Sequence, residues 1–150
     1  MIKIFGIGNP LLKDDGIGLK VTEALKEHER VKIYQTEIFV EDALEQIEEN
    51  DYVVIIDAVQ LGKGVGEIHF LSFKECSMLI QPQVFCHERS LLGTLLIDYP
   101  LIKGEMIGIE VAEIDYGEEI SLELSENLQK ILEEVTVHIN KLLRKEISDA

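Results

Sequence analysis

The chain has 150 residues, 46% of them hydrophobic, and a formal net charge of −15. This length fits one domain, and we expect residues 1–150 to form it. The strong negative charge argues against nucleic acid as a partner, because nucleic acid is bound by a basic surface. No apolar run reaches the ~18 residues that a transmembrane helix needs, so we expect no membrane insertion.

The N-terminal segment and the cysteine content lead to an expectation about location. Met1 is followed directly by strand-like sequence, without the basic region, apolar core and cleavage site of a secretory signal peptide. Two cysteines are too few for a disulfide framework. We therefore expect a cytoplasmic protein.

Strand-like and helix-like segments alternate along the first half of the chain. Residues 2–8 are apolar and β-branched, and apolar side chains then recur at helical spacing between residues 16 and 28. A second strand is predicted over residues 31–38, and a short amphipathic helix over residues 40–47. The near-continuous apolar run at 52–59 is typical of a strand that is covered on both faces.

The second half continues the alternation. A strand is predicted over residues 67–73, followed by a less regular stretch and a leucine-rich helix that ends at Pro100. A last strand is predicted over residues 105–114, and apolar positions from Leu128 to Leu142 mark a long terminal helix. This pattern predicts a three-layer α/β/α sandwich with a central, mostly parallel five-stranded sheet.

The most informative segment follows the first strand and reads Gly6-Ile7-Gly8-Asn9-Pro10-Leu11-Leu12-Lys13-Asp14-Asp15-Gly16. A glycine turn after a strand often begins a phosphate site, but two adjacent carboxylates repel an anion. The third glycine of a dinucleotide fingerprint and the Lys-Ser/Thr of a P-loop are missing. The loop therefore favours a metal ion or another cation. The alternative is that Asp14 or Asp15 caps the next helix, since Asp is a favoured N-cap residue.

Two more polar features are predicted at the same edge, because ligands of open α/β sheets bind beyond the carboxyl ends of the strands. Asp57 lies near the end of the apolar strand predicted at 52–59, where a charge is costly to bury unless it is paired or binds a cation. His87 precedes the leucine-rich helix. Each has a structural explanation when taken alone: Asp57 could cap a turn, and His87 could be a helix-end histidine. Beside the first loop, they complete a His and carboxylate set suited to nickel, zinc or a similar ion.

The remaining cysteine and histidine residues are weaker candidates. Cys86 is interpreted as a buried, unreactive thiol, and Cys76 lies in irregular sequence without an evident partner. His28 and His138 are interpreted as surface residues of amphipathic helices, and His69 as a strand residue. None of them is expected to carry the chemistry.

These features resemble the hydrogenase maturation endopeptidases, the proteases that process the C-terminus of the [NiFe] hydrogenase large subunit. That family has a Gly-x-Gly-Asn-x-Leu-x-x-Asp-Asp/Glu-Gly/Ala-x-Gly loop, an Asp-Ala pair after a hydrophobic strand and a histidine before a Leu-rich helix. Here the corresponding parts are residues 6–18, Asp57-Ala58 and His87. The resemblance covers nearly the whole chain. Residues 35–40 depart from the glycine-rich turn that is common in the family, so a differently shaped substrate groove is expected.

The resemblance implies an endopeptidase that removes the C-terminal extension of a nickel-loaded [NiFe] hydrogenase large-subunit precursor. By matching positions, Asp15, Asp57 and His87 would be the catalytic and metal-contacting residues. The nickel would be carried by the substrate, and the precursor would be the partner. The alternative interpretation is a non-catalytic metal-binding or docking factor in hydrogenase assembly that uses the same residues.

Overall fold

The computed structural model describes residues 1–36, 40–79 and 90–149. Strands and helices alternate as the sequence predicts. In chain order the elements are β1 (Ile2–Ile7), the 3-10 turn η1 (Lys13–Gly16), α1 (Ile17–Ala24), β2 (Val31–Thr36), α2 (Val40–Glu45), β3 (Tyr52–Val59), β4 (Ile68–Ser72), α3 (Phe73–Met78), α4 (Leu91–Asp98), β5 (Lys103–Glu110) and α5 (Leu122–Asp149).

The five strands form one sheet in the order β2-β1-β3-β5-β4. The strands β2, β1, β3 and β5 are parallel, and β4 pairs with β5 in the antiparallel direction. This confirms the prediction of a mostly parallel, five-stranded sheet. After β1 the chain adds β2 on one side and β3 on the other, so the direction of winding switches between β1 and β3. In sheets of this kind, ligands bind beyond the carboxyl ends of the strands at the switch point.

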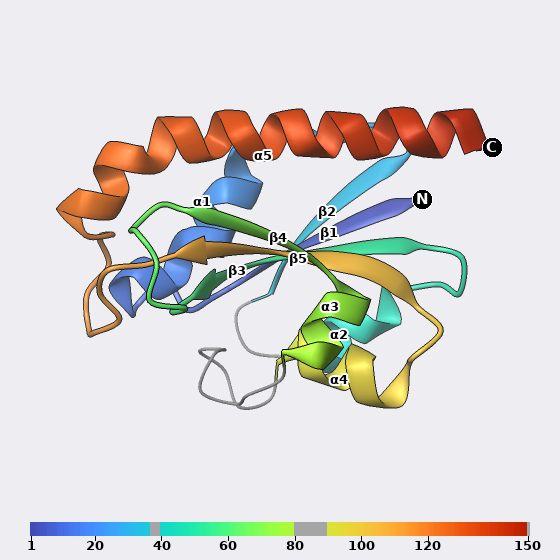
Figure 1. Cartoon of the computed structure of the whole chain (residues 1–150), viewed down its shortest axis with the longest axis horizontal. Coiled ribbons are helices and arrows are strands. Elements are labelled where there is room, and N and C mark those ends of the chain that lie inside the picture. Colours follow the sequence, from blue (N-terminus) through green and yellow to red (C-terminus); the bar gives the residue numbers. More distant parts are fainter. Residues whose placement is uncertain (37–39, 80–89, 150) are drawn as a thin grey trace.

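Helices cover both faces of the sheet (Figure 1). On one face, α1 and α5 pack against a core that includes Ile4 and Ile56. On the other face, α2, α3 and α4 pack against a core that includes Phe5 and Ile55. Because consecutive strand residues point to opposite faces, these two cores alternate along β1 and β3. The predicted three-layer α/β/α sandwich is confirmed.

The first helix is shorter than its apolar spacing predicts. It ends at Ala24, because Leu25 takes an extended backbone conformation with φ −80° and ψ 149°. His28 instead forms an isolated bridge with Val31, so its predicted place in a helix is wrong, although it is exposed as expected. Likewise, α2 ends at Glu45, before the predicted limit of residue 47.

The stretch after β4, predicted to be irregular, begins with the helix α3. Ser72 Oγ accepts a hydrogen bond from the Glu75 backbone N–H at 3.1 Å, and a Glu75 carboxylate oxygen accepts one from the Ser72 N–H at 3.2 Å. This is a capping box, and the sequence pattern Ser-x-x-Glu that produces it was available as a helix-start signal. Cys76 is therefore a buried helix residue.

The last strand, β5, ends at Glu110, four residues before the predicted limit of residue 114. Just beyond this end, the backbone N–H groups of Ala112 and Glu113 both donate to Asp14 Oδ2 at 2.9 Å instead of continuing a ladder. The predicted strand end is thus replaced by a contact with the loop that follows β1. None of the helices in the described part of the chain is long and apolar enough to cross a bilayer.

Candidate active site

The loop after β1 brings α1 into direct contact with the ends of two strands. A Cβ atom at Gly18 would lie 2.3 Å from the Ile7 carbonyl oxygen and 2.4 Å from that of Ile56. A Cβ atom at Gly6 would lie 2.3 Å from Thr22 Oγ1. Only glycine fits at such distances. These two glycines therefore allow the first turns of α1 to rest on β1 and β3 at the switch point.

Asp14 is fully buried and joins two loops. Its Oδ2 atom accepts hydrogen bonds from the N–H groups of Ala112 and Glu113 and, at 2.8 Å, from Ser121 Oγ. Its Oδ1 atom accepts the Ser121 N–H at 2.6 Å. The N-cap of α1 is Gly16, without a side-chain cap, so the alternative that an aspartate caps this helix is wrong. Asp14 instead fixes the loop after β1 to the segment after β5.

Asp15, the next residue, lies within the turn at the end of β1. It is 2% exposed, and its Oδ2 atom accepts the Asn9 backbone N–H at 2.9 Å. Gly8 is required here as well, since a Cβ atom at that position would lie 2.2 Å from the Asp15 carbonyl oxygen. The turn therefore closes tightly around Asp15 and holds its carboxylate beyond the end of β1.

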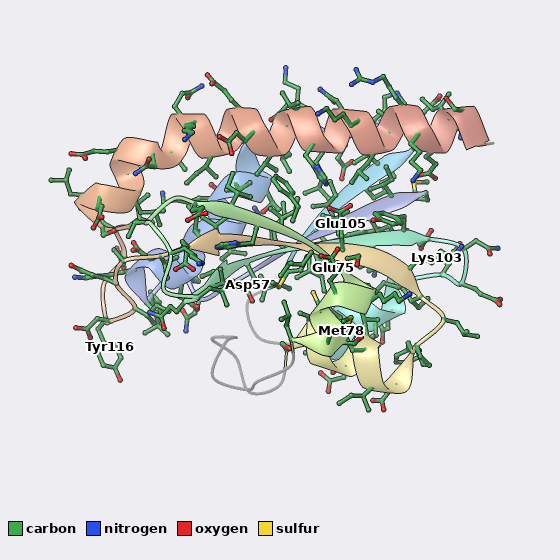
Figure 2. The ribbon with its side chains drawn as sticks, in the orientation of Figure 1. Asp57, Glu75, Met78, Lys103, Glu105 and Tyr116 are labelled. Atoms are coloured by element: carbon green, nitrogen blue, oxygen red, sulfur yellow. The ribbon has the colours of Figure 1, made fainter. Side chains whose placement is uncertain are left out.

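Asp57 lies near the end of β3 (Figure 2). The register pairs Gly6 with Ile56, so Asp57 is level with Ile7, the last residue of β1. It is 5% exposed, and its Oδ1 atom accepts the Ala58 N–H at 2.8 Å. Its side chain points to the face covered by α2, α3 and α4, because Ile55, two residues before it, belongs to that core.

The structure thus places Asp15 and Asp57 at the carboxyl ends of adjacent strands, at the switch point of the sheet. The third predicted residue, His87, lies outside the described residues, and so does Cys86. The chain is described again from Ser90, which caps α4 by accepting the Gly93 N–H at 2.9 Å. Within residues 1–36, 40–79 and 90–149, no three His, Cys, Asp or Glu side chains form a group that could hold a metal ion.

A buried pair at this edge was missed from the sequence. Glu110, at the end of β5, is 2% exposed, and its Oε1 atom accepts the Leu61 N–H at 2.7 Å. The same oxygen lies 3.4 Å from His69 Nε2. The bond from Leu61 attaches the β3–β4 connection to β5, and His69 brings β4 to the same carboxylate. The signal was the one used for Asp57, a carboxylate that ends an apolar strand.

Two of the weaker candidates are structural. Burial raises the pKa of the Cys76 thiol to about 11, with a further contribution from the charge of Glu75. At neutral pH the thiol stays protonated, and only the thiolate is a good nucleophile. His138 is half-buried rather than on the surface, and its Nε2 atom lies 2.5 Å from Glu105 Oε2.

Comparison with known proteins identifies the family. The model of the hydrogenase maturation protease family matches residues 19–142, which is most of the chain. The chain belongs to the hydrogenase maturation protease family. It is therefore a peptidase, and its family role is processing in hydrogenase maturation. The matched range contains Asp57 and begins after Asp15.

Individual relatives agree with this assignment. Protein HydD of Wolinella succinogenes is 33% identical in an alignment of 114 positions that covers 66% of this chain and 70% of HydD. The [NiFe] hydrogenase maturation protease HybD from Thermococcus kodakarensis is 27% identical, with a TM-score of 0.71 over 89% of this chain and 95% of that one. The hydrogenase maturating endopeptidase HybD from E. coli has a TM-score of 0.77 over 93% and 92% of the two chains. At 21% identity, this last likeness supports the fold alone.

Proposed function

We propose that this maturation protease removes the C-terminal extension of a nickel-loaded [NiFe] hydrogenase large-subunit precursor. The observation that carries the proposal is the position of two buried carboxylates, Asp15 beyond the end of β1 and Asp57 near the end of β3. A pair of carboxylates attracts a cation, and the switch point is where a ligand of this sheet binds. We further propose that residues 1–150 act as one domain in the cytoplasm.

In this proposal Asp15, Asp57 and His87 contact the nickel that the precursor carries, and so recognise a loaded substrate. Carboxylate and imidazole groups are suitable ligands for nickel. Hydrolysis adds one water molecule across the scissile amide. Asp15 or Asp57 accepts a proton from that water as its oxygen bonds to the carbonyl carbon, and returns the proton to the amine that leaves when the C–N bond breaks.

The test follows the mass of the precursor. The purified chain is mixed with candidate large-subunit precursors, nickel-loaded and nickel-free, and intact masses are measured over time. We expect loss of a short C-terminal peptide from the loaded form only. Stable binding without any change in mass would instead favour a non-catalytic docking factor. Cleavage of both forms at equal rates would refute recognition through nickel.

Three variants test the assigned residues. Asp15→Asn, Asp57→Asn and His87→Ala should each abolish cleavage while the fold is retained, as measured by circular dichroism. Glu118→Gln is the matched control, because it removes one exposed carboxylate from the segment that follows β5. Full activity of any one of the three variants would remove that residue from the site.

A further inference from the structure

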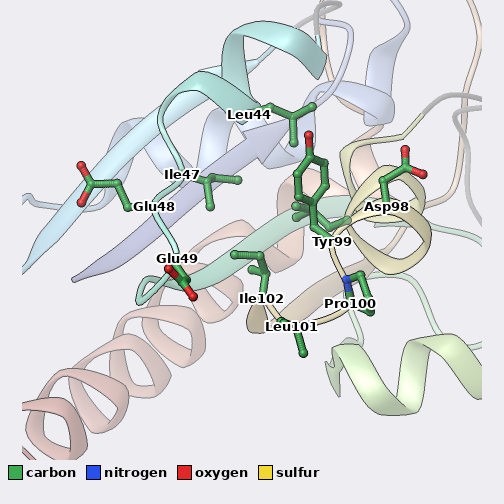
Figure 3. A pocket seen from close by; sticks show the side chains of 10 residues that line it. Leu44, Ile47, Glu48, Glu49, Asp98, Tyr99, Pro100, Leu101 and Ile102 are labelled. Carbon is green, nitrogen blue, oxygen red and sulfur yellow. The ribbon is translucent and has the colours of Figure 1, made fainter.

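A second feature of the surface lies on the layer toward which Asp57 points. The end of α4, the loop after it and α2 form a hollow of about 420 Å³ (Figure 3). We call this hollow the α2–α4 groove. Its apolar lining includes Leu44, Ile47, Leu95, Tyr99, Leu101 and Ile102.

The apolar surface continues outside the groove. Leu101 is 87% exposed, Ile97 is 75% exposed and Tyr99 is 47% exposed. An exposed apolar patch with a polar rim is typical of an interaction site. A small molecule in the hollow would leave Ile97 and most of Leu101 in water. The patch therefore fits a protein partner that covers both the hollow and its outer edge.

The rim of the α2–α4 groove is acidic. Glu48 and Glu49 lie on one side and Asp98 on the other, and all three are exposed. Asp98 is the last residue of α4, whose final turn carries no basic residue, so the negative end of the helix dipole adds to its charge. Complementary charge favours a partner with a basic side chain next to an apolar one. A second copy of a chain with net charge −15 is a poor match.

The charge of the adjoining surface limits where the basic side chain of the partner can lie. On the other side of Leu101, a neighbouring hollow is lined in part by Lys74 and Lys103. The three acids of the rim thus surround the α2–α4 groove, whereas the two lysines line the neighbouring hollow. A basic residue of the partner belongs over Glu48 and Glu49, with its apolar neighbour between Leu101 and Ile47.

The groove lies at the amino edge of the sheet, whereas the candidate active site lies at the carboxyl edge. Glu49 closely precedes β3, and Ile102 directly precedes β5. In β3, the five residue steps from Tyr52 to Asp57 span about 17 Å. A protein–protein interface of ordinary size buries about 800 Å² on each partner, and such a patch is wider than this span. A folded precursor bound at the site is therefore large enough to reach the groove.

We propose that the α2–α4 groove is an exosite that binds a basic, apolar surface segment of the hydrogenase large-subunit precursor, remote from the cleaved tail. This inference rests on the proposed function for the identity of the partner. The groove adds affinity for the folded precursor and takes no part in the chemical step. Its removal changes KM and leaves kcat unchanged.

The first test replaces Leu101, the most exposed apolar side chain of the α2–α4 groove. Leu101→Ser should raise KM for the nickel-loaded precursor about fivefold or more, with kcat unchanged, as the loss of an interface anchor does. Val137→Ser is the control, because Val137 is 53% exposed on α5, the opposite layer of the sandwich. An unchanged KM for Leu101→Ser, or an equal rise for both variants, would overturn the exosite. Loss of a self-dimer in Leu101→Ser, with an unchanged KM for the precursor, would also overturn the exosite.

The second test reverses the charge of the rim. The double variant Glu49→Lys/Asp98→Lys should slow association with the precursor about tenfold at low salt, and the difference should shrink as salt is added. The control is Glu123→Lys/Glu126→Lys, two exposed acids of α5. Equal association rates for both double variants would overturn the basic character of the partner.

A binding measurement separates this inference from the proposed function. If the wild-type chain binds the precursor without cutting it, the proposed peptidase step fails. The Kd of Leu101→Ser, measured by calorimetry, then decides about the groove by itself. A Kd at least fivefold weaker than wild type supports the exosite, and an equal Kd, or no binding by the wild type, refutes it.

Discussion

Buried carboxylates lie at both edges of the sheet, but their partners differ. At the amino edge, Lys3 Nζ lies 2.8 Å from Asp51 Oδ2. Glu105 contacts His138 Nε2 at 2.5 Å and accepts the Tyr52 hydroxyl at 2.8 Å. Although burial opposes it, the hydrogen bond and charge of Asp51 raise the pKa of the Lys3 ammonium. Side chains that can carry a positive charge thus balance the acids at this edge.

At the carboxyl edge, backbone N–H groups donate to Asp15, Asp57 and Glu110, and Glu110 Oε1 also lies 3.4 Å from His69 Nε2. Asn9 donates to Asp15, and Ala58 donates to Asp57. A backbone N–H group orients a carboxylate but brings no net charge, unlike the Lys3 ammonium beside Asp51. In the proposed function, Asp15 and Asp57 receive a cation from a substrate, whereas the acids at the amino edge hold the fold together.

The largest effect is expected from the charge-removing variants at the carboxyl edge. Asp15→Asn and Asp57→Asn should lower the cleavage rate by a factor of about 10²–10⁴, because a group that transfers protons contributes on this scale. Urea unfolding should place each variant within about 1 kcal/mol of wild type, as for most single substitutions that leave the core intact. A loss of stability large enough to account for the lost activity would show that Asp15 and Asp57, like the acids at the amino edge, mainly stabilise the fold.

We expect substitution of Asp14 to reduce stability, as for the acids at the amino edge, although Asp14 is next to Asp15. In Asp14→Asn, the side-chain nitrogen is placed against donor groups of Ala112, Glu113 and Ser121, so buried donors lose their acceptor. The free energy of unfolding in urea should fall by about 2–3 kcal/mol, the cost of unsatisfied buried groups. Asp115→Asn, at an exposed position of the same segment, serves as the control. Unchanged stability of Asp14→Asn would show that the loops are held together by other contacts.

At the amino edge, Tyr52→Phe should reduce stability without affecting cleavage. Burial, and then the hydrogen bond to Glu105 and its charge, raise the pKa of Tyr52 above its usual value of 10.0. The raised pKa means that the stabilising contribution is fully present below pH 10 and is lost as the pH rises through the folded-state pKa.

The corresponding measurement compares unfolding free energies at several pH values. At pH 7, Tyr52→Phe should be less stable by about 1.5 kcal/mol, the contribution of a hydrogen bond to a charged group. The gap between wild type and variant should narrow above pH 10. Tyr116→Phe is the control, since Tyr116 is 87% exposed. A gap that is independent of pH would show that Glu105 does not accept the Tyr52 proton as described.

The smallest effect is expected for Cys76, a buried residue of α3 that contacts neither set of carboxylates in the described contacts. Its pKa of about 11, raised by burial, leaves about 0.1% thiolate at pH 8. In a Cys86→Ser background, iodoacetamide should label the folded chain far more slowly than the urea-unfolded chain. Rapid labelling, or loss of cleavage once Cys76 is modified, would point to a thiol in the chemistry.

The sequence by itself determined the architecture and predicted the location of the candidate site. The alternation of apolar strands and amphipathic helices specified a three-layer sandwich, since each pattern buries one kind of surface. Asp57 and the aspartates of the first loop were predicted at the carboxyl edge, because each follows a strand of a parallel sheet. The residues Gly6 and Gly18 marked the loop, and their close approach to Thr22 and the strand ends gives the physical reason.

Only the tertiary structure decided which contacts each of the two neighbouring aspartates, Asp14 and Asp15, makes. Asp14 and Asp15 are chemically identical, and the turn η1 directs one toward the segment after β5 and the other toward the turn at Asn9. That choice depends on a contact across about a hundred positions of the chain, so no local pattern contains it. The same contact replaces the predicted end of β5. His138 was predicted on the surface because its partner is also distant in sequence. Its partner Glu105 is 33 residues away in sequence and becomes a neighbour only when α5 packs on the sheet.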